Sequence, residues 1–140
     1  MHSSIQNSLI RFFENNADKN SIKYAFLFGS YARGNVHEES DIDIAVIFSK
    51  DYSEDTQFRV IEKLSLDIEK ELHKEINMLV ITDDFKKPML YYNAIVLGVP
   101  LYFENENELY ELRFRAISEM EDFLIFGLKW QLEVAQRNLG

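Results

Sequence analysis

The chain has 140 residues, 46% of them hydrophobic and 14% aromatic, and we expect a core and no long disordered segment. Its net charge of −9 argues against a surface that wraps nucleic acid, because phosphate neutralisation needs clustered Lys and Arg. Cysteine is absent, which excludes disulfides and thiolate chemistry. No stretch reads as a signal peptide or approaches the roughly 18 consecutive apolar residues of a membrane span. We therefore expect a soluble cytoplasmic protein without membrane contact.

The first half of the chain alternates helical and strand patterns. Apolar residues recur at helical spacing over about 3–16. Two short β-prone runs follow, KYAFLF ending at Gly29 and IDIAVIF at 42–48. The segment SKDYSED is predicted to form a loop and the start of a long helix. The apolar face predicted for that helix carries Phe58, Ile61, Leu64, Ser65, Ile68 and Leu72.

The second half continues the alternation. INMLVI at 76–81 is predicted to be a third strand. Pro88 is well placed near a helix start, and Gly98 is well placed to end that helix before the short strand VPLYF. The order helix, strand, strand, helix, strand, helix, strand predicts an α/β (α+β) fold with one small mixed sheet packed with helices.

The C-terminal segment is expected to be a single apolar-rich helix over about 107–138. One stripe carries Leu109, Leu112, Ala116, Met120, Phe123 and Leu124, and FLIFGLKW broadens the apolar surface beyond it. Such a helix needs more than one neighbour. Packing on its own domain and binding to a partner both remain open. We divide the chain into a domain at 1–104 and a helical extension at 105–140, with Gly127 as a candidate kink or close-approach point.

Two aspartates interrupt an apolar run. Asp41 and Asp43 are one residue apart, so within a strand their side chains leave the same face, about 6–7 Å apart. Ile42 and Ile44 then face the core on the other side. Burying carboxylates costs several kcal/mol unless something compensates, and a divalent cation would do so. Mg²⁺ is usually held by one or two carboxylates with phosphates and water, and a pair of such ions fits an in-line phosphoryl or nucleotidyl displacement.

A glycine and a hydroxyl end the preceding strand. Gly29 lets backbone approach a phosphate closely, and the hydroxyl and amide of Ser30 can bind its oxygens. Arg33 adds a charged fork for the same polyphosphate. Taken alone, a Gly-Ser turn is usually a turn, and an exposed pair of aspartates is usually solvated. Taken together, the two strands, the turn and the spacing of the aspartates predict a functional site for a metal ion and a polyphosphate.

The same residues carry a family resemblance. Ser30, ten intervening residues, Asp41 and Asp43 form GSYARGNVHEESDID, which resembles the G-S-x10-D-x-D signature of the DNA polymerase β-like nucleotidyltransferases. The blocks GSYARG and SDIDIAV look like those of the minimal nucleotidyltransferases. LGVPLYFENENELYELRFRAISEMEDF resembles the segment after the catalytic core in the antitoxins of this group that pair with HEPN toxins. The resemblance covers most of the chain.

The resemblance implies an activity and a role for each matching residue. Gly29 and Ser30 would hold the triphosphate of ATP. Asp41 and Asp43 would be the catalytic residues that bind Mg²⁺ or Mn²⁺. In the antitoxin group, AMP is transferred from ATP to a tyrosine of the HEPN ribonuclease toxin, which is thereby silenced. The implied partners are therefore ATP and a HEPN-type toxin.

One position departs from the family pattern. The family commonly has a third carboxylate on the next core strand, and aligning its pattern DVDLV with EINML places Asn77 there. An amide oxygen can contact a metal but neither offsets its charge nor acts as a base. Glu75, two residues earlier, should share the strand face and is a candidate substitute.

The missing acid leaves an alternative function open. A catalytically weakened nucleotidyltransferase fold would neutralise its partner by binding alone. Transfer to a small molecule such as an aminoglycoside is a third possibility. It is disfavoured because no extra substrate domain is visible in the sequence.

Overall fold

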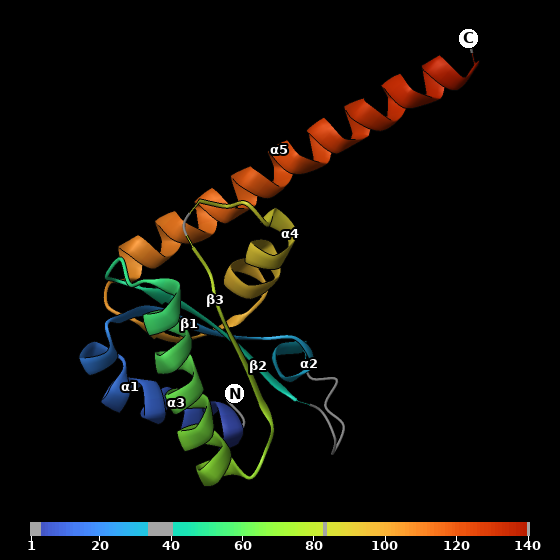
Figure 1. The fold of residues 1–140 in the computed structure, drawn as a ribbon. Coiled ribbons are helices and arrows are strands. Elements are labelled where there is room, and N and C mark those ends of the chain that lie inside the picture. Colours follow the sequence, from blue (N-terminus) through green and yellow to red (C-terminus); the bar gives the residue numbers. More distant parts are fainter. Residues whose placement is uncertain (1–3, 34–40, 83, 140) are drawn as a thin grey trace.

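The computed structural model describes residues 4–33, 41–82 and 84–139, which form a small sheet with helices on both faces (Figure 1). In chain order the elements are α1 (Ser4–Asn16), η1 (Asp18–Asn20), β1 (Ile22–Phe28), α2 (Ser30–Arg33), β2 (Ile42–Phe48), α3 (Glu54–Leu72), β3 (Ile76–Val80), α4 (Pro88–Tyr91), η2 (Tyr92–Val96), β4 (Val99–Phe103) and α5 (Glu106–Leu139). The predicted order of helices and strands is confirmed, with α4 and η2 together forming the predicted helix after Pro88, and α2 and η1 are additions to it.

The sheet is mixed, with strand order β3-β2-β1-β4. β1 is antiparallel to both β2 and β4, whereas β2 and β3 are parallel and are joined by α3. The end of one parallel strand and the start of the next lie at opposite ends of the sheet, so a crossover such as α3 is needed to join them. This arrangement confirms the predicted α+β class and makes β1 and β2 the two central strands.

The central strands are covered on both faces. On one face Leu27, Ile42 and Ile44 pack with apolar residues of α1 and α3. On the other, Phe26 and Ala45 pack with α4, η2 and the first part of α5. Strands covered on both sides read as nearly continuous apolar runs rather than alternating ones, which explains KYAFLF and IDIAVIF.

The helix α3 begins and ends as its sequence predicts, with one difference in its buried face. The Ser53 Oγ accepts the Thr56 N–H at 3.3 Å, and His73 closes the helix in the left-handed region at φ 54°. Leu64 and Ile68 are buried, but Phe58 is 63% exposed. Placing Phe58 on the packed face was wrong, because it lies about 120° around the helix from Leu64, at the margin of the stripe.

Gly98 and Gly127 have different surroundings. Pro88 occupies the first turn of α4, and η2 continues it to Val96, so the predicted start and end are close to those observed. A side chain at Gly98 would collide with the carbonyl oxygens of Ala94 and Leu27. Gly127 has no atom within 4 Å of where a Cβ would be, and α5 runs unbroken through it. The predicted close approach at Gly127 is therefore not made within this chain.

The long helix α5 has an attached and a projecting part. Leu109 and Ala116 are buried against α4 and η2. The Arg113 side chain donates to the carbonyl oxygens of Ile95 at 3.0 Å and Gly98 at 3.4 Å. Beyond these contacts the helix extends away from the body of the molecule (Figure 1). No helix among the described residues combines the length and apolarity that crossing a membrane would require.

Candidate nucleotide and metal site

The predicted site residues meet at one edge of the sheet, where β1 ends and where β2 and β3 begin. The antiparallel register sets Phe28 opposite Asp43, and the parallel register sets Asp43 opposite Asn77. Asp43 and Asn77 are each the second residue of their strand. The strand alternation places both on the face that packs against α4, η2 and α5. Three segments far apart in sequence therefore converge at this edge.

Gly29 requires glycine for two reasons. Its φ of +72° lies in the left-handed region, which strains residues with a Cβ. A Cβ built at this position would also collide with the Asp43 carboxylate. The turn backbone therefore passes directly against Asp43. The predicted approach of this backbone to a phosphate stays a prediction.

Ser30 and Arg33 bound the short helix α2. Ser30 directly follows Gly29 and therefore lies at the same sheet edge. It is partly exposed. The backbone of Arg33 ends α2, but its side chain is outside the described part of the structure. The predicted contribution of Arg33 to phosphate binding therefore stays a prediction.

The two aspartates lie at the start of β2. Asp43 is partly buried within the strand, whereas Asp41 is exposed and directly precedes it. The prediction that both lie inside the strand is therefore correct for Asp43 and wrong for Asp41, which lies one residue before the strand begins. Ile42 and Ile44 are fully buried, as the alternation predicts. Neither carboxylate incurs the full cost of burial.

Asn77 occupies the place that the sequence alignment predicts for the third acid. Its Nδ2 donates a hydrogen bond to Asp43 Oδ1 at 3.1 Å, and its side chain is exposed. Glu75 precedes β3, and its backbone carbonyl accepts the Ile42 N–H at 3.0 Å. Within the described ranges, no group of three acidic, His or Cys side chains is placed to hold a metal ion. Glu75 therefore does not complete a three-acid group with Asp41 and Asp43.

The chemistry of this edge fits a hard divalent cation. Two carboxylates and an amide oxygen are donors of the kind that Mg²⁺ accepts, with phosphate oxygens and water completing the shell. The two salt bridges found among the described residues, Lys23–Glu108 and Asp84–Lys86, do not involve Asp41 or Asp43. No lysine or arginine in this part of the chain thus neutralises the pair by a salt bridge.

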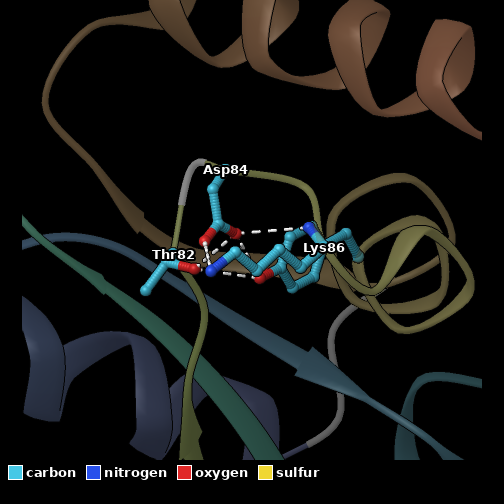
Figure 2. A network of polar contacts seen from close by, with 4 residues as sticks. Thr82, Asp84 and Lys86 are labelled. Carbon is cyan, nitrogen blue, oxygen red and sulfur yellow. Dashed lines mark hydrogen bonds and ion pairs between the residues drawn. The ribbon is translucent and has the colours of Figure 1, made fainter.

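A second polar cluster follows the other end of β3 and was not anticipated from sequence. The Asp84 carboxylate accepts hydrogen bonds from Thr82 Oγ1 at 2.8 Å, the Lys86 N–H at 3.2 Å and Tyr91 Oη at 3.3 Å, and lies 3.6 Å from Lys86 Nζ (Figure 2). The pKa of Asp84 is held below its usual value, mainly by the hydrogen bond from Thr82 and next by that from the Lys86 N–H. The segment TDDFK did contain a sequence signal for part of this cluster, because Asp and Thr side chains commonly hydrogen-bond to nearby backbone groups in turns.

A cavity of about 610 Å³ lies on the same sheet face, at the ends of the strands away from Asp43. Its charged lining is mixed, with Lys23, Lys50 and Arg115 opposed by Asp51, Glu108 and Glu111. None of the predicted site residues lines it. Size alone therefore does not identify the candidate site in this fold.

The topology and the turn beside Asp43 define a nucleotidyltransferase-type α+β domain. The family model described as "Polymerase beta, Nucleotidyltransferase" matches residues 7–107. The chain therefore belongs to the polymerase β nucleotidyltransferase family.

Solved structures give the same fold over most of the chain. A chain of a toxin–antitoxin complex with AMP-PNP superposes with a TM-score of 0.68 at 20% identity, covering 94% of this chain and 98% of that chain. A chain of the Shewanella oneidensis MNT antitoxin complex with its tri-AMPylated HEPN toxin gives 0.63 at 18% identity, with 97% and 99% covered. Spectinomycin adenyltransferase from Enterococcus faecialis gives 0.55 at 16% identity, with 85% and 67% covered. No curated protein sequence matches the chain.

Proposed function

We propose that this chain is a metal-dependent nucleotidyltransferase that transfers AMP from ATP to a tyrosine of a HEPN-type ribonuclease toxin, and thereby acts as the antitoxin in the cytoplasm. The observation that carries the proposal is the juxtaposition of the Gly29 backbone with the Asp43 carboxylate at a sheet edge. A turn that admits phosphate beside a carboxylate that can hold a cation brings together the two parts of a triphosphate site.

Each residue has a distinct task in the proposed reaction. Gly29 and Ser30 hold the triphosphate through backbone and hydroxyl groups, with Arg33 as a further cationic contact. Asp41 and Asp43 hold Mg²⁺ or Mn²⁺, which when bound neutralises phosphate charge and lowers the pKa of the acceptor hydroxyl. The tyrosine oxygen forms a bond to the α-phosphorus and gives its proton to water, while the bond from the α-phosphorus to the bridging oxygen breaks and pyrophosphate leaves with the electrons of that bond.

Two matched structures that contain a toxin together with an antitoxin support a protein acceptor. The chains from the two toxin–antitoxin complexes are matched over 98% and 99% of their own length. The chain of the spectinomycin enzyme is matched over only 67%. The remaining third of that enzyme's chain lies outside the match.

The test is a mass measurement on the partner. The protein encoded beside this chain is purified, incubated with the chain, ATP and Mg²⁺, and weighed by intact mass spectrometry. We expect a gain of AMP-sized mass that disappears with Asp41→Asn/Asp43→Asn. Asp84→Asn is the matched control, because it also neutralises an aspartate but lies away from the site. No gain, or equal gain with the double variant, would rule out the enzymatic proposal.

Asn77 favours a second candidate function, neutralisation of the partner by binding with little or no catalysis. Its amide donates to Asp43, so it occupies one acceptor site of a presumed metal ligand and contributes no negative charge. Asn77→Asp distinguishes the candidates. A large rise in AMP transfer would show that the native site is impaired, whereas an active native protein unchanged by the substitution would eliminate this candidate.

A further inference from the structure

We propose that residues 117–139 of α5, called here the distal segment, are a docking element that lies in a groove between two helices of the partner protein. The identity of that partner as the HEPN-type toxin rests on the proposed function. The docking geometry rests on the surface of the helix alone.

The distal segment exposes an unusual amount of apolar surface. Ile125 is 67% exposed, Phe126 72% and Trp130 58%. The other large apolar side chains exposed on the segment are Ile117, Phe123, Leu124, Leu128, Leu132 and Leu139. At roughly 150–250 Å² per large side chain, these residues present on the order of 1,000 Å². The largest patch on a typical monomer is about 300–600 Å², whereas one partner's share of a stable interface is about 800 Å².

The apolar residues surround most of the helix rather than one stripe. At roughly 100° per residue, Phe123 and Ile125 point about 160° apart. Relative to Ile125, Phe126 is rotated about 100° around the helix in one direction and Leu128 about 60° in the opposite direction. A single helix packed alongside would cover one stripe only. Two neighbouring helices are therefore needed, and a groove between two helices of one partner supplies both.

Charge favours a different protein over a second copy of this chain. Each copy carries a net charge of −9, so two copies repel each other. The distal segment itself is acidic, with Glu119, Glu121, Asp122 and Glu133 against Lys129 and Arg137. A partner groove bordered by lysine and arginine would be complementary to this segment and to the rest of the chain.

The anchoring of α5 relates the docking element to the candidate site. The proximal part is fixed by Leu109 and Ala116 in the core and by the Arg113 hydrogen bonds to Ile95 and Gly98. These contacts attach α5 to the sheet face on which the strand alternation also places Asp43. A partner held by the distal segment would therefore be tethered on the side from which an acceptor would approach, which raises its effective concentration at the site.

The test compares charge substitutions on opposite sides of the helix. Phe123→Glu and Ile125→Glu each place a carboxylate on the apolar surface, about 160° apart. Gln136→Glu adds the same charge at an exposed position three turns beyond Ile125, about 20° around the helix from it, on the polar arc that also carries Asp122, Lys129 and Glu133. Affinity for the full-length protein encoded beside this chain is measured by calorimetry, and helicity by circular dichroism. We expect each apolar substitution to weaken binding by about tenfold or more, and Gln136→Glu by less than about twofold.

Each remaining outcome contradicts part or all of the inference. If only one of Phe123→Glu and Ile125→Glu weakens binding, contact is one-sided and the groove is wrong. If neither does, or if the wild-type chain does not bind, the docking element is wrong. If sedimentation shows the chain alone forming a tight dimer that both substitutions dissociate, the occupant is a second copy. Asp41→Asn/Asp43→Asn should abolish AMP transfer but keep binding, so failure of the proposed chemistry is seen separately.

Discussion

The two ends of β3 carry aspartates in opposite circumstances. Before the strand, across from Asn77, the Asp43 carboxylate accepts one side-chain hydrogen bond, at 3.1 Å. After the strand, Asp84 accepts three hydrogen bonds and lies 3.6 Å from the Lys86 ammonium. An ionised carboxylate has about four acceptor sites. At Asp84 the described residues provide three hydrogen bonds to Oδ1 and an ammonium group 3.6 Å from Oδ2, whereas at Asp43 they provide a single side-chain hydrogen bond, to Oδ1.

The difference separates a structural carboxylate from one available to a ligand. Asp84 accepts hydrogen bonds from Thr82, which follows β3, and from Tyr91 at the end of α4, and so links these two residues. Asp43 lies in its strand beside the Gly29 turn, and among the described side chains only Asn77 donates a hydrogen bond to its carboxylate. Substitutions at these two positions should therefore affect different measurements, activity for one and stability for the other.

The largest effect is expected at Asp43. Asp43→Asn should lower AMP transfer by about 100-fold or more, because even changes to residues that merely support metal ligands cost roughly 10–100-fold. Asp84→Asn should leave the transfer rate within about threefold. Single-turnover rates with ATP and Mg²⁺ measure both. Equal losses in the two variants, with both proteins folded, would mean that the contrast between the carboxylates has no functional meaning.

Gly29 and Gly127 offer a comparison of the same substitution in two environments. Gly29→Ala should lower both thermal stability and ATP affinity, because the methyl group collides with Asp43 and the backbone has φ +72°. We expect a loss of about 1–3 kcal/mol. Gly127→Ala has open space and a helical backbone, and should stabilise by about 0.5–1 kcal/mol. Chemical denaturation and calorimetry with ATP give both quantities, and a tolerated Gly29→Ala would remove the steric argument for the site.

A smaller change is expected at Asn77, and it sharpens the contrast by adding a charge beside Asp43. Asn77→Asp replaces an amide donor by a carboxylate and should tighten Mn²⁺ binding by about tenfold or more, since charge count tunes cation affinity. Asn77→Ala removes the hydrogen bond without adding charge and serves as the control. Mn²⁺ binding is followed by electron paramagnetic resonance, independently of activity. Unchanged binding in Asn77→Asp would mean that this side chain lies outside the metal's reach.

The strands and the site edge were largely predictable because their determinants are local. The run 42–48 matches β2 residue for residue, and the strand alternation alone places Ile42 and Ile44 in the core. The position of Asn77 also followed from alignment with a family pattern, and the register confirms that it faces Asp43. These features depend on spacing within a strand or on a motif, both of which are properties of the sequence.

What could not be predicted depends on tertiary contacts. Nothing in TDDFK indicates that Tyr91 will return to Asp84, since that hydrogen bond joins a loop to a later helix. Phe58 has the spacing of a packed residue but lies at the margin of the stripe. The sequence showed that apolar residues surround most of α5. Only the fold shows from which residue onward the helix projects from the rest of the domain. Whether a partner covers the distal segment therefore needs the binding experiment.

The smallest effect is expected at the Asp84 cluster, and it depends on pH. The pKa of Asp84 is lowered in the folded protein, first by the Thr82 hydrogen bond, so its contribution to stability is present above the unfolded pKa of about 3.9. This contribution is lost as pH falls through the folded pKa. Asp84→Asn should therefore lower the Tm slightly at neutral pH, and the difference from wild type should shrink below about pH 4.

The matched variant for this last test is Tyr91→Phe, which keeps the buried ring and removes only the hydroxyl that reaches Asp84 and Thr82. The Tyr91 hydrogen bond lowers the pKa of Asp84 less than the Thr82 and Lys86 contacts do, and those contacts remain. Tyr91→Phe should therefore show a smaller shift of Tm with a weaker dependence on pH. Thermal denaturation from neutral pH to about pH 3 follows both variants. A pH-independent difference for Asp84→Asn would mean that the carboxylate stabilises the loop by packing rather than by its charge.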